Sequence, residues 1–128
     1  MAWDRAGWRW VRILRGLTSR HRKSEQKSSN QENAAYPSGL CAERVAIFQA
    51  GAIYPNAKIE KLALTAASDV SVTASPIPPC GACRQSIAEY ELKQDYPIEI
   101  YFMGESGVIY KSDSLKNLLP FAFDKNFL

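Results

Sequence analysis

The three cysteines of this 128-residue chain are spaced like the ligands of a catalytic metal ion. One lies in Cys41-Ala42-Glu43, and the other two lie in Pro79-Cys80-Gly81-Ala82-Cys83. Three thiolates occupy three corners of the tetrahedron that Zn²⁺ prefers and leave the fourth open, which is typical of catalytic zinc sites. A closed structural site needs a fourth ligand, and the only histidine, His21, lies outside this pattern. The spacing therefore predicts one zinc ion per chain, held by Cys41, Cys80 and Cys83.

Glu43 is the candidate proton carrier of this site. A carboxylate two residues after Cys41 is placed to move protons to and from a water molecule at the open zinc position. The alternative, a favourable acidic charge in the first turn of a helix, is sufficient for Glu43 taken alone. The joint spacing with the cysteines favours the catalytic role. Beside it, the backbone N–H of Ala42 is a candidate for holding the reacting centre, and Arg44, together with Arg84, for withdrawing charge from the thiolates.

The elements that position these residues follow from periodicity and breaker residues. We expect one helix to begin near Cys41 and a second to run from about Cys80 to about Lys93. Ser114 is a candidate N-cap for a short helix that ends before Pro120. Strands are expected over residues 62–67, 98–102 and 108–110, and a rigid proline-rich loop over residues 75–79. This alternation favours an α/β layer fold with parallel pairing in part of its sheet.

Two longer runs around the cysteines resemble the small cytidine deaminases of the all-cysteine, homotetrameric class. The runs extend from Asn30 to Arg44 and from Pro79 to Gln85, and the resemblance covers about residues 29–128. It implies a three-layer α-β-α fold with a mixed five-stranded central sheet and one zinc ion per subunit. It also implies a hydrolase of pyrimidine salvage that converts cytidine or deoxycytidine to uridine or deoxyuridine and ammonia. The resemblance further implies that this enzyme is a cytoplasmic homotetramer.

The same resemblance assigns roles to residues away from the zinc ligands. Asn30 and Glu32 are implied to hold the ribose hydroxyl, and Tyr36 matches a position between subunits. Phe123 matches an aromatic residue that stacks on the base across a subunit boundary, although a core or interface role for this side chain stays open. In the implied mechanism zinc lowers the pKa of its bound water, and Glu43 passes protons to the base and then to the departing amine.

Residues 1–28 do not share the composition of the rest of the chain. They contain all three tryptophans and eight basic against two acidic side chains, whereas residues 29–128 contain eight basic and eleven acidic ones. The family begins with a helix and a β-hairpin that we do not find here, so we expect both to be lacking. We treat residues 1–28 as a separate arm, which leaves disorder open, before a deaminase domain at residues 29–128. Residues 18–33 read as a linker.

Two further hypotheses follow from this arm. One is a deaminase that is defective because its N-terminal strands are missing, which would leave the edge of the next strand unpaired. The other is a nucleic-acid-binding protein or polynucleotide deaminase, recruited by a basic amphipathic helix with Trp10, Ile13 and Leu14 on one face. The enclosed nucleoside pocket of the family argues against nucleic acid as a partner. An odd number of cysteines argues for a reducing compartment, and no apolar run approaches the roughly 18 residues of a membrane span.

Overall fold

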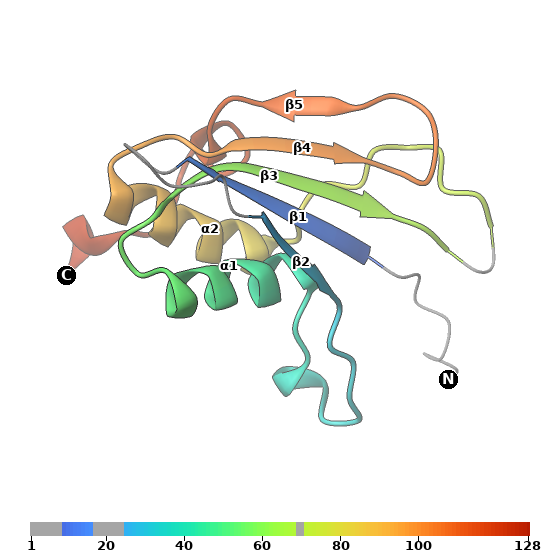
Figure 1. Ribbon diagram of the computed structural model, residues 1–128, viewed down its shortest axis with the longest axis horizontal. Coiled ribbons are helices and arrows are strands. Elements are labelled where there is room, and N and C mark those ends of the chain that lie inside the picture. The colour runs from blue at the N-terminus through green and yellow to red at the C-terminus, as the bar shows by residue number, and fades with distance from the viewer. Residues whose placement is uncertain (1–8, 17–24, 69–70) are drawn as a thin grey trace.

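A five-stranded mixed sheet forms the centre of the molecule (Figure 1). The computed structural model describes residues 9–16, 25–68 and 71–128. The strands lie in the order β2-β1-β3-β4-β5, with β3 and β4 parallel and the other neighbours antiparallel. Their bounds are Arg9–Gly16 for β1, Glu25–Ser29 for β2, Lys58–Ala66 for β3, Glu99–Met103 for β4 and Tyr110–Ser112 for β5.

Helices α1 (Ala42–Ile53) and α2 (Gly81–Gln94) lie side by side on one face of this sheet (Figure 1). Helix α2 connects the parallel strands β3 and β4, because a parallel pair needs a long crossover and cannot be joined by a tight turn. The two helices bury their apolar stripes against alternate residues of β3 and β4. The buried residues of this core include Ala46, Ile47, Leu62, Leu64, Ile87, Ile100 and Phe102.

Most of the predicted elements are confirmed. The α/β fold with a mixed sheet is present, and both long helices begin within about a residue of the predicted positions. The Ser114 hydroxyl caps a short 3₁₀ helix, Leu115–Asn117, by accepting the N–H of Lys116. The last strand begins at Tyr110 rather than at residue 108, because Val108 and Ile109 are exposed in the turn after Gly107, whose φ is +93°. A helix on the opposite face, which a three-layer fold requires, is not among the described residues.

The prediction that the β-hairpin is lacking is wrong. Strand β1 pairs with both β2 and β3, so that Val11 lies opposite Ser28 on one side and Leu64 on the other. The hydrogen bonds between neighbouring strands are made by the backbone. Strand β1 therefore pairs with the edge of β3 that we expected to be unpaired. The register shifts between Leu14 and Arg15. Such an irregularity breaks the two-residue alternation by which a strand is recognised in sequence.

The separate arm, the linker and the alternative basic helix are corrected by the same hairpin. Residues 9–16 are a strand and not a helix, and residues 25–29 are a strand within the predicted linker. The boundary at residue 28 therefore does not separate an arm from the domain. The family's first helix and the predicted disorder, where they concern residues 1–8 and 17–24, lie outside the described residues.

A buried carboxylate ties α2 to the far side of the core. Glu91 is 8% exposed and accepts three hydrogen bonds, from the N–H of Ile98 at 2.8 Å, the N–H of Leu115 at 2.9 Å and the Ser114 hydroxyl at 2.6 Å. Buried polar groups are costly unless they are paired, and here the carboxylate is matched by donors from two other segments. Glu91 therefore fixes α2 against the start of β4 and the short helix after β5.

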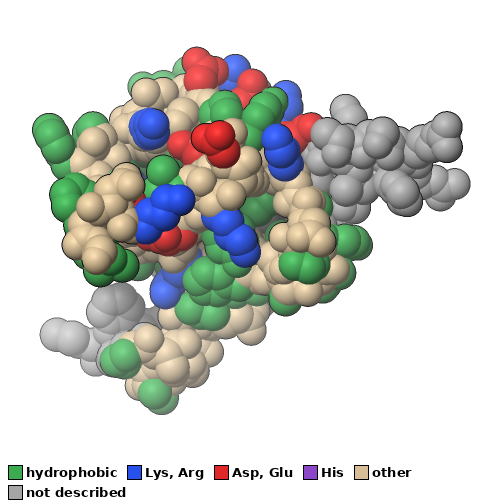
Figure 2. Space-filling model, turned by 90° about the vertical axis from the view of Figure 1, so that its left-hand side faces the viewer, with side chains coloured by type: hydrophobic (Ala, Val, Ile, Leu, Met, Phe, Trp, Pro, Cys, Tyr) green, Lys and Arg blue, Asp and Glu red, His purple; other side chains and the backbone are tan. Residues whose placement is uncertain are grey.

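The surface combines charges of both signs with exposed apolar side chains. Figure 2 shows the end of the molecule that carries the C-terminus, where Lys and Arg side chains stand next to Asp and Glu. Large apolar side chains are exposed near the C-terminus, among them Phe121 at 97%, Phe123 at 59% and Phe127 at 69%. Within the described ranges, no helix combines the length and the apolar character needed to cross a membrane.

Candidate active site

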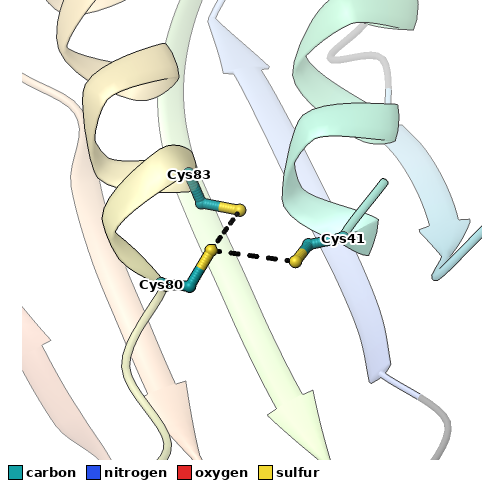
Figure 3. Close-up of side chains that lie close together, drawn as sticks. All are labelled: Cys41, Cys80 and Cys83. Carbon is teal, nitrogen blue, oxygen red and sulfur yellow. Dashed lines mark hydrogen bonds between the residues drawn. The ribbon is translucent and has the colours of Figure 1, made fainter. Parts of the chain in front are cut away.

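The three cysteine sulfurs meet at the N-terminal ends of α1 and α2 (Figure 3). Cys41 is the N-cap of α1, Cys80 is the N-cap of α2, and Cys83 lies in the first turn of α2. The Sγ atoms of Cys41 and Cys80 are 3.8 Å apart, and those of Cys80 and Cys83 are 3.4 Å apart. All three sulfurs lie within 4.8 Å of one another. The fold thus brings together residues that are about forty positions apart in the sequence.

This sulfur triangle has the size that a zinc ion requires. Zinc–sulfur bonds of about 2.3 Å in tetrahedral geometry place neighbouring sulfurs about 3.8 Å apart. The two short sulfur–sulfur distances are close to this value. Cys83 is buried, Cys41 is half-buried and Cys80 is exposed, so the cluster lies at the edge of the core and is open on one side. The donor set and its spacing therefore fit a three-thiolate zinc site.

Burial, neighbouring charges and a bound metal ion all affect the ionisation of the cysteine thiols in this cluster. A hydrogen bond to Cys41, burial and the charge of Glu43 all raise the pKa of the Cys83 thiol far above its ordinary value. A bound metal ion reverses this effect, because a coordinating thiol loses its proton outright. The N-termini of two helices add partial positive charge at the same place. The helix N-termini favour thiolates with or without a metal ion, whereas the buried Cys83 thiol is deprotonated when a metal ion binds.

Arg44 lies beside the sulfurs, as predicted from the sequence. Burial lowers the pKa of its guanidinium, but contacts with Cys41 and Cys83 raise it, and the net pKa is raised. The Nη2 atom donates to the carbonyl of Gly39 at 3.3 Å. Its buried Nε has no hydrogen-bond partner in the part of the chain that the structure describes. A guanidinium held in this way can withdraw negative charge from the thiolates.

Glu43 is fully buried in the first turn of α1, two residues from Cys41. The residue between them, Ala42, is held from the other side by the hairpin. Its N–H donates to Oδ1 of Asn30 at 2.9 Å, and its carbonyl accepts the Ser28 hydroxyl at 2.7 Å. The Ala42 N–H, which we predicted to help hold the reacting centre, is thus engaged by Asn30 in this structure.

Asn30, Glu32 and Phe123, which the resemblance singled out, are half-buried or exposed. Asn30 follows β2 directly and is half-buried, whereas Glu32 is exposed. Tyr36 begins the 3₁₀ helix Tyr36–Ser38. The ring of Phe123 stacks on that of Phe127 with centroids 5.7 Å apart and planes at 16°. Their predicted roles toward a substrate or a second subunit remain predictions.

The two residues that directly follow Cys83, Arg84 and Gln85, donate hydrogen bonds to backbone carbonyl groups that we did not predict from the sequence. Arg84 donates to the carbonyls of Pro79 at 2.8 Å and Leu118 at 3.2 Å, and not to sulfur as we expected. Gln85 donates from Nε2 to the carbonyl of Phe123 at 2.8 Å. Both side chains tie the C-terminal segment to the first turns of α2. Their position directly after a candidate metal ligand was the available signal, but the carbonyl groups of Leu118 and Phe123 lie more than thirty residues away.

Comparison with known proteins gives consistent results. The family described as the cytidine and deoxycytidylate deaminase zinc-binding region matches residues 18–96. A cytidine deaminase of Sporosarcina psychrophila is 39% identical over 99 residues, which are 77% of this chain and 65% of that protein. A cytidine deaminase of Halalkalibacterium halodurans is 43% identical over 63 residues, which are 49% of this chain and 43% of that protein. The chain thus spans less than two thirds of the length of either relative.

Solved structures extend the likeness over more of the fold. The crystal structure of cytidine deaminase from Burkholderia pseudomallei has a TM-score of 0.70 and 30% identity, and the match covers 91% of this chain and 82% of that one. The cytidine deaminase of Bacillus anthracis has a TM-score of 0.60 at 18% identity, over 95% of this chain and 79% of that one, and supports the fold alone. The likeness thus extends over about nine tenths of this chain.

Proposed function

Because this chain belongs to the cytidine and deoxycytidylate deaminase family, with a zinc-binding region, we propose that it hydrolyses cytidine or deoxycytidine to the corresponding uridine and ammonia. The observation that carries the proposal is the meeting of three sulfurs within 4.8 Å, next to the fully buried carboxyl group of Glu43. The water molecule supplies the new C4 oxygen, and the exocyclic amino group leaves as ammonia.

Cys41, Cys80 and Cys83 would hold the zinc ion. When bound, zinc supplies Lewis-acid activation of water and lowers its pKa toward neutrality. The protein leaves one coordination position to water or substrate, because it offers three thiolates and no fourth ligand at this cluster within the described residues. Arg44 and the two helix N-termini offset the negative charge of the thiolates, which otherwise weakens the metal as a Lewis acid.

Glu43 would carry the protons. Its carboxylate takes a proton from the attacking water and gives it to N3 of the pyrimidine, and a second transfer takes the proton of the new C4 hydroxyl group to the amino group as it leaves C4. One carboxyl group can act as base and then as acid, because it returns to the ionised carboxylate after it has delivered each proton. Full burial of Glu43 keeps bulk water away from these transfers.

The remaining candidate residues would bind the nucleoside. Asn30 and Glu32 are proposed to hold the ribose hydroxyl, Ala42 to support the reacting centre, and Phe123 to stack on the base from a neighbouring subunit. Asn30 is joined by a hydrogen bond to the helix that carries Glu43, so a sugar bound there would be placed relative to the carboxylate. The exposure of Phe123 in the single chain is compatible with a site completed by a second copy.

We also propose the setting in which this reaction takes place. The enzyme acts on free nucleosides as a cytoplasmic homotetramer, in the salvage of pyrimidines, without nucleic acid or membrane as a partner. Strand β1 takes Arg9, Arg12 and Arg15 into the sheet, which removes the basic helix on which the nucleic-acid hypothesis depended. The same hairpin removes the reason for expecting a defective enzyme.

Glu43→Gln tests this function directly. The purified wild-type chain should consume cytidine in an ultraviolet assay and contain about one zinc ion per chain. The variant should keep its zinc but lose more than the about 10²–10⁴-fold of ordinary acid–base catalysis, because one residue serves several steps. An active Glu43→Gln protein, prepared without wild-type contamination, would contradict the mechanism.

A further inference from the structure

Ser28 lies in the core although it is a polar residue near the end of an outer strand. It is 9% exposed, and its hydroxyl donates to the carbonyl oxygen of Ala42 at 2.7 Å. That carbonyl already belongs to the hydrogen-bond ladder of α1, and a carbonyl oxygen can accept a second bond. The hydroxyl therefore does not replace a missing helical partner. It adds a link between strand β2 and the first turn of α1.

The link complements the hydrogen bond made by Asn30. The N–H that Asn30 accepts belongs to the peptide group joining Cys41 to Ala42. The carbonyl that Ser28 contacts belongs to the next peptide group, which joins Ala42 to Glu43. Both peptide planes between the proposed ligand and the proposed proton carrier are thus anchored by the hairpin. The backbone dihedrals of Ala42, which set how Cys41 and Glu43 point relative to one another, are held from outside the helix.

We propose that Ser28 is a positioning residue that fixes Glu43 relative to the zinc-binding cysteines. The inference rests on the proposed function, and it gives the N-terminal hairpin a part in catalysis beyond closing the sheet. Ser28 touches neither substrate nor metal and acts through the peptide group between Ala42 and Glu43. Small displacements of a catalytic group lower the rate strongly, with about 1 Å costing about 10²-fold, so a looser first turn should reduce turnover rather than substrate binding.

Ser28→Ala is the test, with Ser29→Ala as the matched control on the same strand. We expect Ser28→Ala to lower kcat by about tenfold and to change KM less than twofold, because only the placement of Glu43 is altered. Zinc content should remain at about one per chain, but zinc should pass to a chelating dye several-fold faster, since Cys41 is less firmly held. Ser29→Ala should behave like the wild type in all three measurements.

A second pair of variants covers the case in which Ser28→Ala does not fold. Thr and Val have nearly the same shape and differ in the hydroxyl, and both favour strands. Ser28→Thr should retain kcat and slow zinc release, whereas Ser28→Val should show the loss expected for Ser28→Ala.

Three outcomes would overturn the proposal. The first is unchanged kcat and zinc release in the variants without a hydroxyl. The second is a raised KM at unchanged kcat, which would indicate substrate contact. The third is a lower melting temperature with neither effect, which would indicate a purely structural bond. If the wild-type protein binds zinc but does not deaminate cytidine, the proposed function fails, while the zinc-release comparison still tests Ser28. A wild-type protein without zinc would overturn both.

Discussion

At the scale of single residues, Cys83 is the candidate zinc ligand that lies deepest in the core. Its side chain is fully buried, and its neighbours strongly disfavour the thiolate in the absence of a cation. A protein gains little from three cysteines packed in this way unless their sulfurs share a positive charge. Pro79 is also fully buried directly before Cys80, the N-cap of α2, and the first turn of that helix brings Cys80 and Cys83 to the same side.

We therefore expect Cys83→Ala, and equally Cys41→Ala and Cys80→Ala, to lose bound zinc. Two thiolates remain in each variant, and zinc sites in proteins rely on at least three protein ligands. Zinc per chain, measured by atomic absorption after dialysis, should fall from about one to near zero. Ser86→Ala, one turn further along α2, is the control and should keep its metal. Full zinc retention in all three cysteine variants would show that the metal is bound elsewhere.

At the scale of elements, Glu91 joins α2 to the residue before β4 and to the short helix after β5. Removing its side chain leaves the N–H groups of Ile98 and Leu115 without an acceptor in the core. Each unsatisfied buried donor costs about 1–3 kcal/mol. We expect Glu91→Ala to lower the free energy of unfolding by about 3 kcal/mol, measured by urea denaturation. Glu89→Ala, on an exposed position of the same helix, should change it by less than about 0.5 kcal/mol. Equal effects of the two substitutions would refute this role.

The hairpin is the element whose contribution changes most once the structure is known. Strand β1 has neighbours on both sides, so each interior N–H of β1 faces a strand. We expect Val11→Pro to cost about 2 kcal/mol or more, because a ladder hydrogen bond is lost and proline does not fit a central strand. The melting temperature followed by circular dichroism measures this. Val72→Pro, at an exposed loop position, is the control and should melt close to the wild type. An unchanged melting temperature in Val11→Pro would mean that β1 is not an integral strand.

The elements of the fold differ in how clearly the local sequence predicts them, for physical reasons. Helices α1 and α2 have clear starts, because Cys41 and Cys80 follow a glycine turn and a proline run, and their burial follows the helical period. The candidate zinc ligands were chosen from their spacing alone, and the structure brings their sulfurs together. Strand β1 was missed because its arginines and its register shift hide the alternation, and its stability depends on partners far along the chain. The anchors Ser28, Arg84 and Gln85 act through distant carbonyls, which no local pattern reveals.

At the scale of the whole molecule, the single chain leaves its C-terminal aromatic residues uncovered. Exposed apolar side chains of this size commonly mark an interface, and here they follow a segment that is fastened to α2. The bond from Gln85 to the carbonyl of Phe123 fixes the backbone of this segment two residues from a proposed zinc ligand. A neighbouring copy that covers this surface would receive Phe123 in a defined position. The proposed homotetramer should be detected by light scattering, with this surface at an interface between copies.

Phe123→Ala tests whether this aromatic residue reaches the base in a neighbouring subunit. Stacking of a base on an aromatic ring contributes about 1–3 kcal/mol, so its loss should raise KM for cytidine by about tenfold to a hundredfold. Turnover at saturation should change little, since the proton carrier and the zinc ligands are untouched. Phe121→Ala, at a neighbouring position with 97% exposure, is the matched control and should leave KM within about twofold of the wild type. Both variants are compared by steady-state kinetics at equal measured mass. An unchanged KM in a tetrameric Phe123→Ala protein would exclude stacking, and a similar rise in both variants would assign the effect to a general loss of the aromatic surface.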